Sequence, residues 1–414
     1  MQSMYNIAKR IYSGGEMSNA SSSAIRISTI GVAVGVMVMI ISLCVTSGFQ
    51  GEIKNKITSL LGHAQIVNTQ TLYSNKTNPI QISDSLLEVI QSEPNVAKVT
   101  RFVLCRGMIK TDSDFRGILL RGVDAAFDTT FISKSLVSGK MPVFGADSVS
   151  SDSILLPMRL ANLLELKAGD KVYTYFFDNK LRARRFVIAG IFETNMADFD
   201  NQMCYVDSRV AQKLTNWSHD QYQGAEIVFH DKDKAAETIY DIASKICYDT
   251  DAYGHYYSVS SVEELFPQIF SWLTLLDTNV AAILILMISV ACVTVVSGLL
   301  IIILERTRFI GVMKAIGATN AQLRHLFLYL SAMIVVRGLF WGNIVAFSLL
   351  AIQKFLGVLK LDPATYYLDQ VPVHFPGYQI LAINVATFAM CVLVLTVPTY
   401  IISRIHPARS IKFE

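Results

Sequence analysis

Hydrophobic residues gather in four long runs, at residues 27–47, 278–304, 326–352 and 378–403, whereas polar and apolar residues mix between the first run and the second. A helix needs about 20 apolar residues to cross roughly 30 Å of hydrocarbon, so each run is long enough. The first two runs contain no charged residue. A buried core helix is the alternative for any single run, but four such runs together indicate four membrane spans.

The first run does not have the pattern of a cleaved signal peptide. Its preceding polar segment has 26 residues, and no small-x-small cleavage site follows it. In that segment Met4, Ile7, Ala8 and Ile11 have helical spacing, which predicts an amphipathic helix on the membrane surface. A Gly/Ser/Asn-rich stretch, residues 13–23, is expected to act as a hinge before the first span.

Basic residues in the short segments predict the orientation, because Lys and Arg are enriched in cytoplasmic loops. They occur before the first span, after the second span and after the fourth: Lys9, Arg10, Arg26, Arg306, Arg308, Lys314, Arg324, Arg404, Arg409 and Lys412. Both termini are therefore expected in the cytoplasm. The predicted organisation is a cytoplasmic amphipathic helix (1–24), span one (25–47), an extracytoplasmic domain with stalks (48–273), span two (274–304), a cytoplasmic loop (305–325), span three (326–352), a short outer loop (353–377), span four (378–403) and a cytoplasmic tail (404–414).

The net charge of +3 is the sum of two unlike parts. Residues 48–273 carry a net charge of −4 and the rest of the chain +7. A mildly acidic outer domain does not favour nucleic acid as a partner. The six cysteines fit no disulfide framework and are expected as free thiols, with one disulfide in the outer domain as the alternative.

The outer domain mixes strand and helix patterns, which predicts an α/β fold. Alternating or β-branched segments predict strands at residues 63–68, 97–111, 116–122, 171–177 and 185–192. Helical periodicity predicts helices at 83–92, 157–164, 207–214 and 232–246, and residues 198–202 are expected as a polar loop. Phe49, Ile53, Ile57 and Leu60 have helical spacing, so span one is expected to continue outward as a stalk. Residues 258–273 are expected to form a second stalk.

Catalytic and metal-binding motifs are missing from the sequence. It contains no H-E-x-x-H, G-x-S-x-G or C-x-x-C, and its outer histidines are scattered. It also lacks G-x-x-x-x-G-K-[ST], so a P-loop nucleotide site is not expected in this chain. These absences argue against an enzymatic outer domain and predict neither a catalytic nor a metal site.

The cytoplasmic loop after span two contains its own short helix signal. Phe309, Ile310, Met313 and Ile316 fall on one helical face, and basic residues surround it. Gly317 can end this helix, and the Thr319-x-x-Gln322 pattern is typical of a capping box that begins the next. The segment is either an interfacial helix resting on lipid or a coupling helix that docks on a separate ATPase.

The same segment carries a resemblance. Residues 305–319 read E-R-T-R-F-I-G-V-M-K-A-I-G-A-T, which resembles the E-R-x-x-E-I-G-x-x-K-A-L-G-A signature of FtsX-like, MacB-type (type VII) ABC transporter permeases. Phe309 stands where that family commonly has an acidic residue. Similarity to the lipoprotein-releasing group (LolC/LolE-like) extends over Arg26-Ile27-Ser28, Ser47-Gly48-Phe49, Leu166-Lys167-Ala168-Gly169-Asp170, Gly190-Ile191-Phe192, Tyr366-Tyr367-Leu368-Asp369, Pro372-Val373 and Pro407-Ala408-Arg409-Ser410-Ile411.

The resemblance implies a fold, a location and a function. It implies a MacB-like periplasmic domain between spans one and two, in a protein of the bacterial inner membrane. The implied function is that of a non-catalytic permease subunit that extracts lipoproteins from the outer leaflet, for delivery towards the outer membrane. Its cytoplasmic loop would then touch the ATPase through Glu305, Arg306, Arg308, Phe309, Ile310, Gly311, Met313, Lys314, Ala315 and Gly317.

The implied partners are a cytoplasmic ABC ATPase dimer, a second permease subunit (identical or different) and a lipoprotein substrate. ATP and Mg²⁺ would be bound by the ATPase and not by this chain. A periplasmic lipoprotein chaperone is a candidate further partner. LolC-type relatives carry a long, proline-rich hook for it, whereas the corresponding residues 178–185 are short and contain no proline.

Two further sets of residues lie in the spans or, for Phe49, just after span one. Met37, Val38, Ile41 and Phe49 are candidates to line a lipid cavity, with lipid contact or helix packing as the alternative. The charged Arg337, near the middle of span three, is a further candidate for a substrate or lipid contact, with binding to backbone carbonyls or snorkelling as the alternative. Two small-x-x-x-small motifs predict helix packing, the first formed by Gly31 and Gly35 and the second by Gly338 and Gly342.

Two other functions stay open from the sequence. The first is a permease that transmits force to a periplasmic efflux partner or a cell-wall hydrolase and moves no lipid itself. The second is a non-transport sensor or scaffold with an enzymatic outer domain, which the missing catalytic motifs make the weaker hypothesis.

Overall fold

The computed structural model describes residues 19–73, 78–111, 114–145, 152–177 and 181–399. The chain divides into two compact units. The first, here called the helical bundle, comprises the chain up to Glu52, Ser271–Lys360 and the chain from Gln370. The second, here called the sheet domain, comprises Ile53–Phe270 and the segment Leu361–Asp369.

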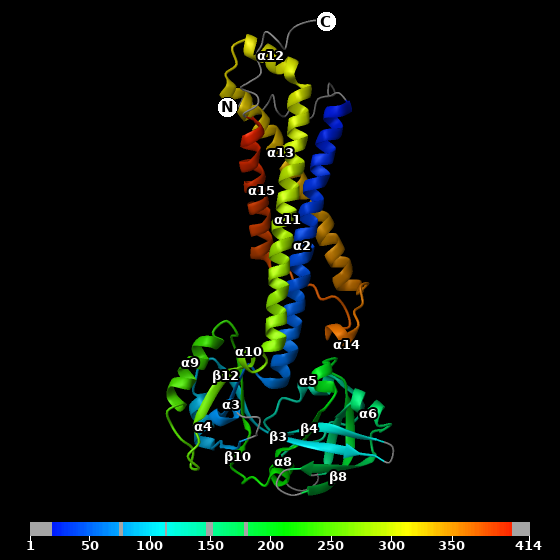
Figure 1. Ribbon diagram of the computed structural model, residues 1–414, viewed down its shortest axis with the longest axis vertical. Coiled ribbons are helices and arrows are strands. Elements are labelled where there is room, and N and C mark those ends of the chain that lie inside the picture. Colours follow the sequence, from blue (N-terminus) through cyan, green and yellow to red (C-terminus); the bar gives the residue numbers. More distant parts are fainter. Residues whose placement is uncertain (1–18, 74–77, 112–113, 146–151, 178–180, 400–414) are drawn as a thin grey trace. The chain divides into compact units, whose positions relative to one another are not determined.

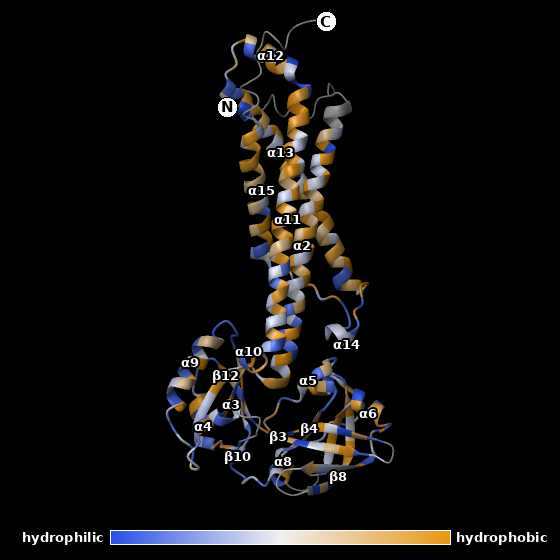
Figure 2. Ribbon diagram, viewed as in Figure 1, coloured by the Kyte–Doolittle hydropathy of each residue, from blue (hydrophilic) through white to orange (hydrophobic). Residues whose placement is uncertain are grey.

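The helical bundle contains four helices that are long and apolar enough to cross a membrane. They are α2 (Asn19–Leu61), α11 (Pro267–Glu305), α13 (Asn320–Leu356) and α15 (Gly377–Thr399), and the short α12 (Thr307–Ala315) connects α11 to α13 (Figure 1). Figure 2 shows these helices coloured mainly as hydrophobic. Each predicted span except the end of the fourth (residues 400–403, outside the described residues) lies within one of these helices.

The first small-residue motif lies against α11, and its two glycines differ in how closely that helix approaches. A Cβ atom on Gly31 would lie 2.5 Å from the Thr294 side chain, so an alanine there would push Thr294 aside. A Cβ atom on Gly35 would lie 3.6 Å from the carbonyl oxygen of Met287 and 3.7 Å from the Ala291 side chain, which are ordinary contact distances. Gly35 is buried in this helix contact, which agrees with the predicted packing role of the motif, although α11 leaves room there for a Cβ atom.

The second small-residue motif lies on α13 and faces α2. A Cβ atom on Gly338 would lie 2.7 Å from the Val32 side chain. A Cβ atom on Gly342 would lie 2.7 Å from the carbonyl oxygen of Ala33, so at Gly342 it is the backbone of α2 that leaves no space. The two motifs therefore do not form one common contact: α2 packs against α11 through the first and against α13 through the second.

The centre of the sheet domain is a ten-stranded mixed sheet in the order β12-β1-β11-β3-β4-β9-β6-β8-β5, and β7 pairs with β3 and β8. Its strands are β1 (Ala64–Asn68), β3 (Val96–Lys110), β4 (Phe115–Val123), β5 (Leu136–Gly139), β6 (Ser153–Pro157), β7 (Lys171–Phe177), β8 (Leu181–Phe192), β9 (Met203–Asp207), β11 (Gly224–Phe229) and β12 (Tyr257–Ser261). A separate pair is formed by β2 (Ile80–Gln81) and β10 (Gln221–Tyr222).

Short helices surround the sheet: α3 (Thr69–Tyr73), α4 (Asp84–Gln91), α5 (Thr130–Lys134), α6 (Met158–Leu163), α7 (Ala197–Asp200), α8 (Ser208–Thr215), α9 (Ala235–Ile246), α10 (Val262–Leu265) and α14 (Pro363–Tyr366). Several begin at a side chain that caps them. Ser83 accepts a hydrogen bond from the Leu86 amide before α4, and Asp207 accepts one from Arg209 before α8. All five predicted strands and all four predicted helices of this domain correspond to observed elements, with small shifts of their ends.

The stalk after span one is also observed, because α2 continues without interruption to Leu61. Ile53 and Ile57 are fully buried on its inner side. The second stalk is wrong in its first part. Residues Tyr257–Ser261 form strand β12, which pairs antiparallel with β1, and a helix resumes only at Val262. The strand escaped the prediction because only two of its five residues are buried.

Two other predictions differ from the structure. Helix α2 already begins at Asn19, so the last residues of the expected hinge are helical. Residues 1–18, which include Met4, Ile7, Ala8 and Ile11 of the predicted amphipathic helix, lie outside the described residues. The expected polar loop at 198–202 includes the last turn of α7, where Phe199 and Asp200 are buried. The predicted cytoplasmic tail, 404–414, also lies outside the described residues.

Candidate functional site

Helix α12 divides its residues between a buried side and an exposed side. Ile310 is fully buried in the bundle core, Gly311 is buried, and Phe309 and Met313 pack against the same core. Val312 and Ile316 are 47% and 79% exposed. With the exposed Arg308, they form one row along the helix at a spacing of four residues. The buried side fixes α12 to the bundle, and the exposed row can meet a partner.

The ends of α12 are defined by local sequence. Gly317 follows the helix with φ +102°, a left-handed conformation that favours glycine, and the chain reverses there. The Thr319 hydroxyl then accepts a hydrogen bond from the Gln322 amide at 3.3 Å, and the Gln322 side chain accepts one from the Thr319 amide at 3.0 Å. This is the predicted capping box. Of the other residues expected to contact the ATPase, Glu305, Arg306 and Lys314 are half-buried and Ala315 is exposed.

The residues expected to line a lipid cavity do not share one environment. Met37, Val38 and Ile41 are all half-buried. Met37 and Ile41 pack against the bundle core, which is typical of side chains that fill the space between helices. Phe49 is buried, with its ring edge-on to Trp272 at a centroid distance of 5.7 Å. Arg337 lies near the middle of α13 at an exposed position.

The segment Leu361–Asp369 joins α13 to α15, yet it belongs to the sheet domain. Lys56 of α2 donates hydrogen bonds to the carbonyl oxygens of Tyr367, at 2.8 Å, and Thr194, at 3.1 Å. The side-chain amide of Asn195 donates hydrogen bonds to the two oxygens of the Asp369 carboxylate at 3.1 and 3.2 Å. The Tyr367 hydroxyl donates a hydrogen bond to the Asp198 carboxylate at 3.4 Å. We call this set of contacts the loop clasp.

Strain and burial reinforce the loop clasp. Asn195 and Tyr367 both have φ near +60°, which is costly for residues other than glycine and persists only where the surroundings enforce it. Leu368 between the polar contacts is buried, at 7% exposure. Sequence reasoning singled out Tyr366 to Asp369 only through the family resemblance. No local pattern pointed to Lys56 or Asn195 as their partners.

A buried ion pair crosses one face of the sheet. Arg121 of β4 and Glu226 of β11 pair with side chains 1% and 5% exposed, and Gln65 of β1 donates to the same Glu226 oxygen at 3.2 Å. The Arg121 guanidinium lies over the rings of Phe102, Phe127 and Tyr205. Burial raises the pKa of Glu226, and Arg121 opposes that shift. The only signal for this pair in the sequence is a charged residue, Arg121, within a segment whose pattern predicts a partly buried strand.

Next to this ion pair is a cavity of about 500 Å³. Its floor is the sheet face of β1, β3, β4, β9 and β11, and its other walls come from the end of α2, from α7 with the following turn, and from α10 with the first turn of α11. We call it the sheet-face pocket. Its lining is mostly apolar: Leu61, Phe102, Leu104, Leu119, Phe199, Met203, Leu265, Phe266, Pro267 and Ile269, with Gln65, Arg121, Asp198, Gln202, Glu226 and Gln268.

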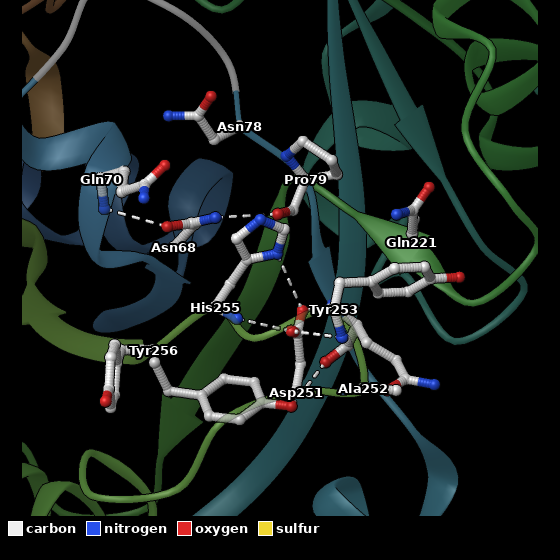
Figure 3. A network of polar contacts seen from close by, with 12 residues as sticks. Asn68, Gln70, Asn78, Pro79, Gln221, Asp251, Ala252, Tyr253, His255 and Tyr256 are labelled. Carbon is white, nitrogen blue, oxygen red and sulfur yellow. Dashed lines mark hydrogen bonds and ion pairs between the residues drawn. The ribbon is translucent and has the colours of Figure 1, made fainter.

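The polar network around Asp251 serves the fold (Figure 3). One Asp251 oxygen accepts hydrogen bonds from the amides of Tyr253 and His255 at 2.9 and 2.7 Å, and the other accepts one from Gln81 at 3.1 Å and contacts the His255 ring at 3.2 Å. Although burial alone would raise the pKa of Asp251, the amides of His255 and Gln81 lower it. The carboxylate thus holds a turn.

The described residues contain no group of three or more His, Cys, Asp or Glu side chains that could hold a metal. All six cysteines are free, as the sequence favoured. In the hairpin region expected to correspond to the chaperone hook, residues 178–180 lie outside the described residues. The adjoining part of β8 is held in place by two arginines. Arg184 forms an ion pair with Asp152 at 3.0 Å, and Arg182 donates a hydrogen bond to the carbonyl oxygen of Leu214 at 3.2 Å.

Comparison with known proteins identifies the class. The MacB-like periplasmic core domain family matches residues 27–243, and the FtsX-like permease C-terminal family matches residues 279–407. The lipoprotein-releasing system transmembrane protein LolC of Xylella fastidiosa strain Temecula1 is 22% identical over 404 residues, covering 94% of this chain and 93% of that protein. LolE of Haemophilus influenzae is 22% identical over 401 residues, covering 93% of each.

Among solved structures, the periplasmic region of MacB from Actinobacillus actinomycetemcomitans aligns with a TM-score of 0.34 at 13% identity, covering 50% of this chain and 91% of that one. The family matches together span both units of the chain and include α12. The chain therefore belongs to the FtsX-like, MacB-type family of ABC transporter permeases.

Proposed function

We propose that this chain is the permease subunit of an ABC transporter in the bacterial inner membrane, and that it extracts lipoproteins from the outer leaflet for delivery towards the outer membrane. The observation that supports this most is the similarity to LolC and LolE proteins over more than nine-tenths of the chain. In this proposal the sheet domain is periplasmic, both termini are cytoplasmic, and ATP hydrolysis with its Mg²⁺ belongs to a separate ATPase.

The bundle supplies a physical basis for the ATPase contact. The exposed row Arg308, Val312 and Ile316 offers two apolar side chains beside one cation, which suits a groove on a partner protein. The same helix is fixed to the bundle core by Ile310. A push on the exposed row is therefore passed to the ends of α11 and α13 that flank α12. A second permease copy, identical or different, completes the transporter.

The cargo explains why such a subunit is needed. Exposing each CH₂ group of an acyl chain to water costs about 0.8 kcal/mol, so three chains of roughly 15 carbons would cost on the order of 30 kcal/mol. A transporter must therefore offer the chains an apolar surface at every stage. A soluble periplasmic chaperone that receives the cargo fits this requirement, and its docking on this chain stays a prediction.

Replacing Val312 with Asp tests the ATPase contact. A carboxylate in the exposed row would be desolvated on docking, so we expect the ATPase to be lost when the tagged chain is purified in mild detergent. Asn320→Asp, which adds the same charge at the exposed first residue of α13, is the matched control and should keep the ATPase. Equal recovery of the ATPase with both variants would refute docking through this row.

Mass spectrometry of the material that copurifies with the unaltered chain tests the cargo. An ATPase together with triacylated lipoproteins supports extraction, and the number of permease types shows whether the dimer is identical or mixed. An ATPase with a periplasmic adaptor or a cell-wall hydrolase, and no lipoprotein, would instead support a permease that transmits force to that partner.

A further inference from the structure

The sheet-face pocket is a cavity of the sheet domain that the proposed function leaves unused. Its walls come from the sheet domain alone, between Leu61 and Ile269. Small-molecule sites are typically cavities of about 300–1,000 Å³ with mostly apolar walls and a few placed polar groups. At about 500 Å³, with ten apolar residues around one ion pair, this pocket has that character.

The register of the strands explains how the pocket floor arises. Gln65 lies opposite Glu226, Leu104 opposite Arg121, and Leu119 opposite Met203, so five strands contribute side chains to one face. Leu104 and Leu119 are only partly buried in the middle of that face. Leucine side chains that stay partly accessible in the middle of a sheet face are a favourable surface for an apolar ligand.

The charges of the floor decide which ligand suits it. Arg121 and Glu226 neutralise each other, and Gln65 also bonds to the glutamate. A free fatty-acid anion would therefore find no uncompensated cation, and Asp198 at the wall would repel it. The exposed amides of Gln202 and Gln268 can instead donate to a neutral carbonyl oxygen.

The size of the pocket sets the length of that ligand. An apolar cavity of about 150 Å³ holds benzene, so the present volume has room for roughly 20 carbon atoms. That is one acyl chain and not three. We infer that the sheet-face pocket binds a single acyl chain of a neutral, amide- or ester-linked lipid, with Gln202 and Gln268 near the carbonyl group.

This inference rests on the proposed function, because it gives one acyl chain of the cargo a shelter outside the membrane helices. The pocket lies beside the last turn of α2 and the first turn of α11, the two helices that also belong to the bundle. Leu61 and Ile269, at these helix ends, both line the pocket.

Photo-crosslinking tests the inference on the full chain in lipid nanodiscs. The probe is an N-alkyl palmitamide with a diazirine near the end of the chain, and the labelled peptides are mapped by mass spectrometry. We expect labels on the strands that carry Phe102, Leu119 and Met203. Excess unlabelled palmitamide should remove them, whereas palmitate anion at the same concentration should not.

Filling the pocket supplies the matched comparison. Leu119→Trp and, from the neighbouring strand, Leu104→Trp should each reduce labelling of these strands by roughly tenfold, because the added ring occupies the volume that holds the chain. Leu163→Trp, the same change at a half-exposed position of α6 outside the pocket, should leave labelling unchanged. An unchanged thermal unfolding transition shows that each variant is folded.

The possible outcomes separate the pocket from the proposed function. Labels confined to the bundle helices, or undiminished in both pocket variants, would overturn the inference and leave lipoprotein extraction standing. Removal of the labels by an apolar peptide but not by palmitamide would also overturn it, since the occupant would be a peptide. Specific labelling of the pocket in a chain that copurifies with no lipoprotein would support the pocket and count against extraction.

Discussion

At the scale of single residues, the sheet domain depends on a charge pair that its sequence places in an apolar environment. Arg121 and Glu226 are both nearly inaccessible to water. Removing one partner of a buried pair typically destabilises a protein by about 3–5 kcal/mol, because the other charge is left uncompensated. Apolar replacement of both partners is much less costly.

Glu226→Leu should therefore lower the thermal unfolding midpoint of the detergent-solubilised chain far more than the double variant Arg121→Met/Glu226→Leu. We expect a loss of about 3 kcal/mol for the single variant, since it leaves the guanidinium buried without its carboxylate. Differential scanning calorimetry would measure both. A single variant as stable as the double variant would show that the pair is not desolvated in solution.

His63 makes the stability of the sheet domain depend on pH. Its Nδ1 atom accepts a hydrogen bond from the Phe229 amide at 3.2 Å, which requires a neutral ring. Burial, helped by the nearby Lys232, lowers the pKa of His63 to about 4. The unfolded chain binds a proton near pH 6.5, so stability is complete above that pH and decreases as the pH falls towards 4.

We expect the unaltered chain to lose on the order of 1–2 kcal/mol between pH 7 and pH 4.5 through this residue, with solvent screening taken into account. His63→Gln keeps an acceptor but cannot take up the proton, so its loss over the same range should be smaller. Thermal unfolding of both chains at the two pH values measures the difference. Parallel pH profiles would contradict the assignment.

At the scale of elements, sequence patterns located what local chemistry determines. The Thr319/Gln322 capping box and the Gly317 helix stop were readable because both signals lie within a few residues of each other. Strand β12 could not be predicted from the sequence, because its five residues include three serines and show no clear strand pattern. They form a strand only by pairing with β1, nearly 200 residues earlier in the chain. The loop clasp depended on contacts of the same long range, from Lys56 to Tyr367.

The small-residue motifs show the same limit between helices. The spacing of Gly31 and Gly35 is the same as that of Gly338 and Gly342, yet the neighbouring helix approaches closely at three of these positions and leaves room for a Cβ atom at Gly35. A four-residue spacing places two glycines on one face of a helix, but the crossing of the partner helix decides which of them it touches. That crossing is a property of the folded bundle.

The loop clasp can be tested by removing its lysine. Lys56→Met keeps the apolar stem but removes two charge-assisted hydrogen bonds, each worth about 1.5–3 kcal/mol. Hydrogen exchange of residues 361–369, followed by mass spectrometry, should then be faster by roughly tenfold or more. The control is Lys54→Met, which removes an exposed pair with Glu263 at 3.7 Å and a cation–π contact with the Phe270 ring at 6.0 Å. Equal exchange in the two variants would show that Lys56 does not hold the segment.

At the scale of the whole molecule, the sequence predicted four spans and a large mixed domain, and the family matches cover both. It could not predict the sheet-face pocket, because that cavity is enclosed by segments between Leu61 and Ile269 that meet only in the folded domain. It also could not separate the buried from the exposed side of α12, since both sides carry apolar residues. Local hydropathy reports that a side chain is apolar and does not report what covers it.

The requirement for lipid gives the last prediction. If acyl chains are what the transporter must shelter, the ATPase activity of the reconstituted permease–ATPase complex should rise with a triacylated lipoprotein. It should stay at the basal level with the same protein whose lipidated cysteine is replaced by serine, because the second cargo has no apolar chains whose exposure costs about 0.8 kcal/mol per CH₂. Equal stimulation by both cargoes would mean that the complex recognises the protein part, and a basal rate with both would favour a permease that drives a periplasmic partner instead.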